Sequence, residues 1–276
     1  MSAPHYMNLS WPEVSNVGTN DSAAIIPVGQ IVQHGPHLPI GTDVFQAEGV
    51  TASVASELCR RRLNAIIGPT ITFGHSPAQE SFPGYLNIRP EVLTDQIEDV
   101  ASCLARQGLR KQAYLMFGPG SWWPLYVAST RLARLGTANM IIIDGLLLAR
   151  TVGMDLLAGH DPSSGKFDVH AGELETSLML AIRPELVRMD KAVSHFSGLH
   201  ASFATCACTK GPLLQQMAAI GMREWIGFGK DGVTGDATLA TAEKGRQIIS
   251  RMVKELAEHF TAHLFAESGT LSKRSS

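Results

Sequence analysis

The sequence predicts an α/β fold: a three-layer sandwich in which helices cover both faces of a mostly parallel sheet. Two observations lead to this prediction. Short, apolar, branched runs typical of buried strands alternate along the 276 residues with longer segments whose apolar residues recur at helical spacing. One run, residues 139–144, is apolar almost throughout, as expected of a strand covered on both faces of a parallel sheet.

Four apolar runs are expected to form the strands. Each is short and bounded by Gly, Pro or polar residues, which are the usual signals of strand ends. These runs are residues 24–29, 64–69, 113–117 and 139–144.

Helix-like segments follow the strands and continue to the C-terminus. In residues 89–107, Pro90 falls in the first turn and the apolar residues Leu93, Ile97, Val100 and Leu104 share one face. A polar tail, residues 267–276, is expected to fray. The predicted helices are residues 44–62, 89–107, 125–135, 173–182 and 241–265.

Composition narrows the class of protein. We find no repeat or linker, so residues 1–276 are expected to form a single domain. The chain carries 23 basic and 25 acidic residues, a formal net charge of −2 that does not indicate nucleic-acid binding. No apolar run is long enough to span a membrane, and we find no signal peptide near the start. We therefore expect a cytoplasmic protein that acts on a small molecule.

Four cysteines give no metal or disulfide motif. Cys59 and Cys103 fall in helix-like apolar patterns and are expected in the core. Cys206 and Cys208 are separated by one residue, unlike the two-residue spacing of zinc and redox motifs. We interpret this second pair as part of an irregular or strand segment.

Four polar segments stand out as candidates for chemistry. Residues 33–43 place two histidines and an aspartate just after the first strand, and His and Asp are natural ligands of Zn, Mn and Fe. Three of the segments follow predicted strands, so we expect them to meet at the carboxyl edge of the sheet. The four segments are residues 33–43, 73–84, 117–124 and 170–177.

Together these segments resemble the creatininase (creatinine amidohydrolase) family. The resemblance rests on Gln-His-Gly-Pro-His-Leu-Pro at 33–39, Phe-Pro-Gly at 82–84, His-Ala-Gly-Glu-Leu-Glu-Thr-Ser at 170–177 and the stretch 235–245. It implies the sheet-and-helices fold derived above. It also implies a metal-dependent hydrolase of cyclic or linear amides, often assembled as a homohexamer.

The chain departs from the family at residues that the resemblance implies are metal ligands. A family Glu is replaced by Val32, and a family His is replaced by Pro119. One of the two family ions would lose these two ligands and keep only Asp43, so a two-metal site is not expected. The resemblance implies that His34, Asp43 and Glu175 remain to hold at most one divalent metal, Zn or Fe.

The resemblance also suggests roles for the remaining polar and aromatic residues. His170 matches a family position implicated in proton transfer, and it joins His34 and Glu175 as a candidate catalytic residue. The alternatives are loop hydrogen bonds for the histidines, a helix-dipole role for Glu175, and a core or interface role for the tryptophans. Candidate substrate contacts are His37, His75, Ser76, Ser121, Trp122 and Trp123.

Three functions remain open from the sequence. The first is a creatininase-like enzyme with a remodelled, more apolar site and at most one metal, acting on a cyclic or amide-containing molecule, for instance in secondary metabolism. The second is a metal-free acid–base enzyme on the same scaffold, catalysing cyclisation, elimination or isomerisation. The third is a non-catalytic binding or partner subunit.

Overall fold

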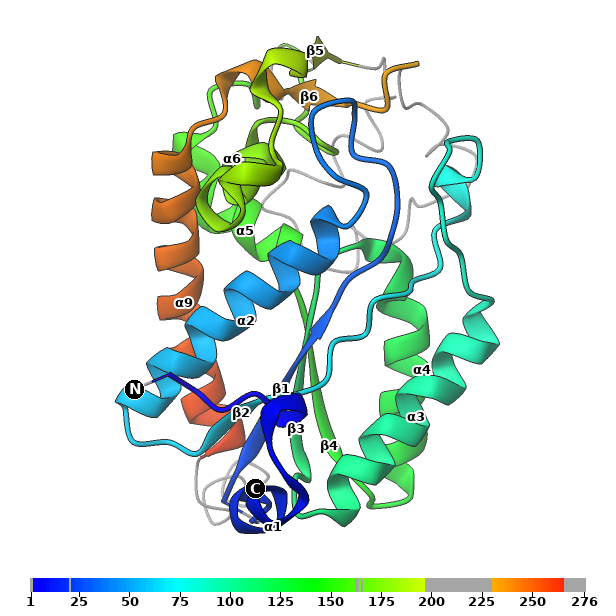
Figure 1. The fold of residues 1–276 in the computed structure, drawn as a ribbon, viewed down its shortest axis with the longest axis vertical. Coiled ribbons are helices and arrows are strands. Elements are labelled where there is room, and N and C mark those ends of the chain that lie inside the picture. The colour runs from blue at the N-terminus through cyan, green and yellow to red at the C-terminus, as the bar shows by residue number, and fades with distance from the viewer. Residues whose placement is uncertain (1, 20, 162–163, 165, 197–229, 266–276) are drawn as a thin grey trace, which may run out of the picture.

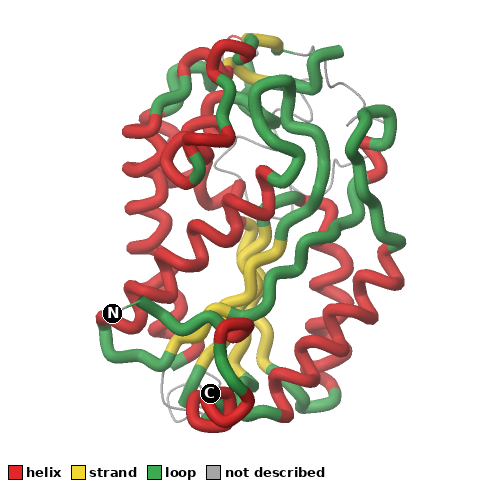
Figure 2. Tube along the Cα trace, in the orientation of Figure 1, coloured by secondary structure: helices red, strands yellow, loops and turns green. Residues whose placement is uncertain are grey.

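A four-stranded parallel sheet forms the centre of the molecule (Figures 1 and 2). The computed structural model describes residues 2–19, 21–161, 164, 166–196 and 230–265. The strand order is β2-β1-β3-β4, and the register places Ile26 beside Tyr114 and Tyr114 beside Ile142. The strands are β1 (Ala23–Val28), β2 (Ala65–Ile67), β3 (Lys111–Met116) and β4 (Asn139–Asp144).

Helices cover both faces of this sheet, which confirms the predicted three layers (Figure 1). One face carries α2 (Thr42–Arg60), α5 (Gly145–Gly153), α6 (Glu173–Ile182) and α9 (Ala242–Leu264). The other carries α3 (Pro90–Arg106) and α4 (Trp122–Arg134).

The two-residue period of the strands divides the core into two clusters. Along β1, Ala23 and Ile25 pack toward α2 and α9, whereas Ala24 and Ile26 pack toward α3 and α4. All six residues of β1 are buried. Burying each such isoleucine stabilises the fold by roughly 1.5–3 kcal/mol.

Strand β4 lies at the sheet edge, where its cover is incomplete. Its faces pack against both core clusters, as the sequence predicts, but residues 140–144 are only partly buried. An apolar run predicts that both faces of a strand are packed. It does not show whether the strand has neighbouring strands at both of its edges or at only one.

Several short elements add to those that the sequence predicts. Helix α1 (Trp11–Val17) begins with a capping box of Ser10 and Glu13, and the Asp144 carboxylate caps α5. Strands β5 (Ser194–His195) and β6 (Gly235–Asp236) pair antiparallel. The 3₁₀ helices are Tyr6–Asn8, Pro77–Gln79, Pro119–Ser121, Met154–Leu156, Pro184–Leu186, Met189–Lys191 and Ala237–Leu239.

Two other expectations concern the cysteine pair and membrane-spanning segments. Cys206 and Cys208 lie outside the described residues. Among the described helices, none is both long enough and apolar enough to cross a membrane.

Candidate metal centre and active site

The candidate site lies beyond the carboxyl ends of the strands, among the loops gathered there (Figure 2). The loop after β1 carries His34, and Asp43 follows in the first turn of α2. His170 lies three residues before the start of α6, and Glu175 lies in the first turn of that helix. Two helix N-termini therefore place carboxylates at the site, where the helix dipoles favour negative charge.

These four side chains meet although they come from distant parts of the chain. His34 Nε2 lies 3.0 Å from Asp43 Oδ1 and 3.5 Å from Glu175 Oε1. His170 Nδ1 lies 3.8 Å from Glu175 Oε2, and the two imidazole rings are 4.5 Å apart between centroids. The side chains of His34, Asp43 and Glu175 are at most 2% exposed.

Three of the four could bind one metal ion. The ligand atoms of His34, His170 and Glu175 all lie within 4.8 Å of one another, the one such group of three among the residues that the structure describes. Glu175 Oε1 is buried and has no hydrogen-bond partner among the described residues. Two imidazoles and a carboxylate suit Zn, Fe or Mn, so these residues fit a single divalent ion. Asp43, a predicted ligand, lies beside His34 instead of within this group.

Backbone carbonyls orient both histidines. His34 Nδ1 lies 3.2 Å from the carbonyl oxygen of Val32, which leaves Nε2 directed at the two carboxylates. His170 Nε2 lies 2.8 Å from the carbonyl oxygen of Gln33, which leaves Nδ1 on the Glu175 side. Carbonyl contacts of this kind fix the tautomer and ring orientation of metal-binding histidines.

The charges at the site are strongly coupled. Burial alone would lower the pKa of His34, but Asp43 and Glu175 outweigh it and raise that pKa well above its usual range. His34 in turn holds the pKa of Glu175 well below its usual range, against the effect of burial. In the metal-free protein, the proton on His34 therefore supplies positive charge between the two carboxylates.

The other two histidines of the site are kept neutral. Burial, together with the charge on His34, lowers the pKa of both His37 and His170 to about 4. His37 is buried with its Nε2 2.8 Å from Thr176 Oγ1, and its Nδ1 has no hydrogen-bond partner.

The remaining predicted substrate contacts have diverse surroundings. His75 Nδ1 lies 3.0 Å from the Ile88 carbonyl oxygen, and the Ser76 backbone N–H donates to Asn87 Oδ1 at 3.0 Å. Ser121 is buried with its hydroxyl unpartnered. Trp122 packs against the core cluster under α3 and α4, whereas Trp123 is 63% exposed on α4 beside Tyr126.

Sequence reasoning missed three glutamines at the site. Gln33 contributes the carbonyl that contacts His170, and its side-chain amide donates to Gln79 and to the Gly232 carbonyl. Gln46 Nε2 donates to the Glu175 carbonyl at 3.2 Å. Gln30 lies near Asp43. Gln33 could have been found from its place beside His34, but the other two become visible only through contacts with distant segments.

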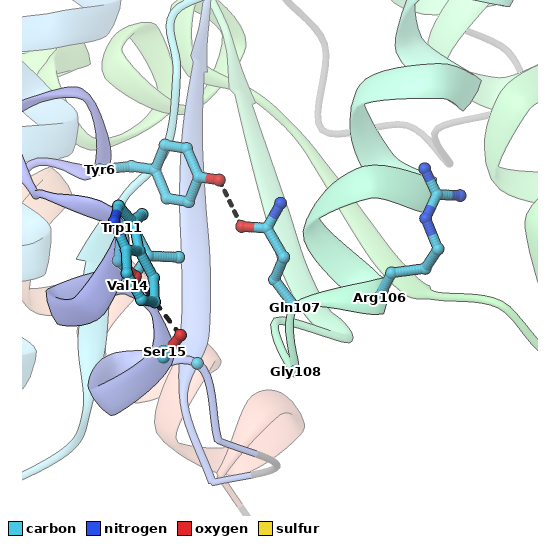
Figure 3. Close-up of a pocket in the computed structure, with 8 residues that line it drawn as sticks. Tyr6, Trp11, Val14, Ser15, Arg106, Gln107 and Gly108 are labelled. Atoms are coloured by element: carbon cyan, nitrogen blue, oxygen red, sulfur yellow. Dashed lines mark hydrogen bonds between the residues drawn. The ribbon is translucent and has the colours of Figure 1, made fainter.

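A pocket lies at the opposite end of the sheet from this cluster, between α1 and the end of α3 (Figure 3). The Tyr6 hydroxyl donates to Gln107 Oε1 across it, and Trp11 is largely exposed at its edge. The pocket is separate from the histidine–carboxylate cluster, because its lining comes from the N-terminal segment with α1 and from the C-terminal end of α3 with the residues that follow it.

Most of the chain matches the model of a known protein family. The family model described as "Creatininase: Creatinine amidohydrolase" matches residues 7–260. The chain belongs to the creatininase family. This match confirms the resemblance seen in the sequence motifs.

Relatives within the creatininase family have different named substrates. The mycofactocin precursor peptide peptidase of Mycolicibacterium smegmatis is 28% identical over 268 residues, covering 94% of each chain. The creatinine amidohydrolase of Pseudomonas putida is 28% identical over 200 residues, covering 68% of this chain and 75% of the relative. The 3-dehydro-scyllo-inosose hydrolase of Thermotoga maritima is 26% identical over 274 residues, covering 91% and 82%.

Solved creatininases share the fold. A manganese form of creatininase superposes with a TM-score of 0.73 at 22% identity, covering 95% of this chain and 99% of the other. A Zn–Zn form of a creatininase variant also gives a TM-score of 0.73 at 22% identity, covering 96% and 99%. Creatininases are thus metal-dependent enzymes, and this chain has their architecture.

Proposed function

We propose that this protein is a metal-dependent hydrolase that cleaves a C–N amide bond with one divalent ion held by His34, His170 and Glu175. The observation that carries the proposal is the buried cluster of these three ligand atoms, all within 4.8 Å of one another. Three protein ligands leave a coordination position open, as in catalytic rather than structural metal sites. Metal-dependent hydrolysis by relatives supports the same reaction class.

The roles of the side chains follow from their contacts. A bound ion would polarise the amide carbonyl and lower the pKa of a water molecule. His34, His170 and Glu175 would hold that ion, with both imidazoles oriented by backbone carbonyls. Asp43 lies 3.0 Å from the ligand nitrogen of His34, so it is placed to accept a proton from the attacking water.

The surroundings of the site bear on the substrate class. The third polar segment contributes Phe117, Pro119 and Trp122, and Phe117 and Trp122 pack into the apolar core clusters. The segment therefore brings no charge to the site, which suits an amide with apolar flanking groups. Relatives named for a peptide and for creatinine favour a peptide or a cyclic amide over other hydrolase substrates. We propose such a substrate, of the kind made in secondary metabolism.

The reaction can be tested directly. Chelator-treated protein is reloaded with Zn²⁺, Fe²⁺ or Mn²⁺ and incubated with creatinine, cyclic dipeptides and short linear peptides, and released amine or new carboxylate is measured by mass spectrometry. We expect turnover that requires the ion and is lost in Glu175→Gln. Glu243→Gln, the same change on the exposed face of α9, is the matched control and should be active.

Other outcomes would favour the two alternatives. Turnover that is unchanged by chelation would overturn the metal role and favour metal-free acid–base catalysis. Absence of turnover, together with intact pathway function after substitution of His34 and Glu175, would favour a non-catalytic partner subunit.

The homohexamer implied by the resemblance remains a proposal. Apolar side chains left exposed along α4, including Trp123 and Tyr126, offer surface for contact between copies. Light scattering on purified protein measures the mass, and a monomer would contradict this proposal.

A further inference from the structure

We propose that Gln30 is a positioning residue that aligns Asp43 and links it to Ser121. The inference rests on the proposed function, because it concerns how the proton-accepting carboxylate is held beside the ion. Gln30 follows the end of β1 by two residues, and its side chain is buried.

Three glycines from two loops enclose the Gln30 side chain. A β-carbon added to Gly74 would lie 2.8 Å from Gln30 Oε1, and one added to Gly120 would lie 3.2 Å from the same atom. A β-carbon on Gly118 would lie 2.7 Å from Gln30 Nε2. Gly118 also has a φ of +108°, which favours glycine. The backbone therefore approaches Gln30 more closely than any other residue type would allow.

The amide nitrogen of Gln30 lies near the oxygen of Asp43 that His34 does not contact. Asp43 Oδ1 is engaged by His34 at 3.0 Å. A β-carbon added to Gly118 would lie 2.7 Å from Gln30 Nε2 and 2.8 Å from Asp43 Oδ2, so the two atoms flank the same backbone position. A neutral N–H donor there complements the carboxylate without competing with the ion for it.

The carbonyl end of the amide lies near Ser121. Among the described residues, neither Gln30 Oε1 nor Ser121 Oγ has a hydrogen-bond partner, and both atoms are buried. Both approach the position of a Gly74 β-carbon, at 2.8 Å and 3.2 Å respectively. A hydroxyl donor and an amide acceptor that lie this close can pair after a small side-chain rotation. The proposed path then runs from Ser121 through Gln30 and Asp43 to His34.

The experiment removes the amide while keeping the side-chain length. Gln30→Met is compared with wild type in metal-reloaded protein, measuring the dissociation constant of Zn²⁺ and, separately, kcat and KM. We expect metal affinity and kcat each to fall about tenfold, as for other residues that orient metal-site groups, with KM changed by less than about threefold. Ser121→Ala should give a smaller loss of kcat in the same direction.

The control is Thr51→Val. Thr51 lies on the same helix as Asp43, and its hydroxyl is buried without a hydrogen-bond partner among the described residues. This substitution should leave metal affinity and kcat within twofold of wild type. Equal losses in Thr51→Val and Gln30→Met, or no loss in a folded Gln30→Met, would overturn the inference.

A second measurement keeps this inference separate from the proposed function. In metal-free protein, the imidazole NMR signals of His34 report its contact with Asp43. We expect these signals to move in Gln30→Met and to stay in place in Thr51→Val. If wild type bound no metal, the proposed function would fail, and the His34 signals would still decide the role of Gln30.

Discussion

The two sides of the site differ sharply in charge. On one side, His34, Asp43, His170 and Glu175 bring four ionisable groups together. On the other side, residues 117–124 contribute Phe, Gly, Pro, Ser and Trp and not a single ionisable side chain. The charge is thus gathered on one wall of the site, while the wall formed by residues 117–124 supplies only neutral polar and apolar groups.

At two positions, residues that cannot bind an ion stand where the family resemblance implies metal ligands. Val32 is buried and contributes to the site through its carbonyl oxygen, which accepts from His34. Pro119 begins the short 3₁₀ helix that precedes α4. Neither side chain can bind an ion, so we propose one metal rather than the two that the family resemblance implies.

The largest expected effect comes from the charged wall. Glu175→Gln removes the charge of a proposed ligand whose Oε1 is buried 3.5 Å from His34 Nε2, and leaves a buried amide facing His34. We expect kcat/KM to fall about 1,000-fold or more, as when a group central to transition-state stabilisation is lost. Steady-state kinetics measure this, and near-wild-type activity in Glu175→Gln would show that the two walls are not functionally different.

A smaller effect should follow from pH. The pKa of His34 is raised by Asp43 and Glu175, so in the metal-free protein His34 is protonated at neutral pH. An ion must displace that proton, and metal binding should therefore strengthen as pH rises, by about tenfold per pH unit for one proton released. Calorimetric titration with Zn²⁺ in buffers between pH 6 and pH 8 checks the slope. A flat profile would contradict the proton-for-metal exchange.

The smallest effect should come from the uncharged wall. Pro119→Ala changes a residue that replaces a family ligand, in a segment that contributes no ligand to the described cluster. Metal affinity should stay within about twofold of wild type, because surface and loop changes remote from such interactions have small energies. Equilibrium dialysis measures it, and a tenfold loss would mean that this wall also takes part in metal binding.

Local patterns predicted the scaffold well. The range predicted for the helix at 173–182 matches α6, because its apolar spacing and the following Pro184 define both ends. Helix α4 begins three residues earlier than predicted, because Trp122 and Trp123 continue the turn started at Pro119. Helix α5 was missed because it follows β4 directly, with Asp144 serving as both strand end and cap.

The site was harder to predict because its contacts are long-range. His34 and His170 are far apart in sequence, and only the fold shows that their rings lie 4.5 Å apart. The expected role of Asp43 as a ligand remains a prediction, and the structure adds that its side chain pairs with His34. The contacts of Gln30 depend on glycines in two other loops, which no periodicity or spacing of the sequence indicates.

The number of metal ions bound per chain tests the proposed one-metal site most directly. His259 and His263 could add a second ion to this number. They lie one turn apart on the exposed face of α9 with ring centroids 4.3 Å apart, a spacing that can chelate metals. The measurement is therefore made by elemental mass spectrometry on the His259→Ala/His263→Ala variant after dialysis. We expect one ion per chain, lost in Glu175→Gln. Two ions per chain, or none after metal supplementation, would contradict it.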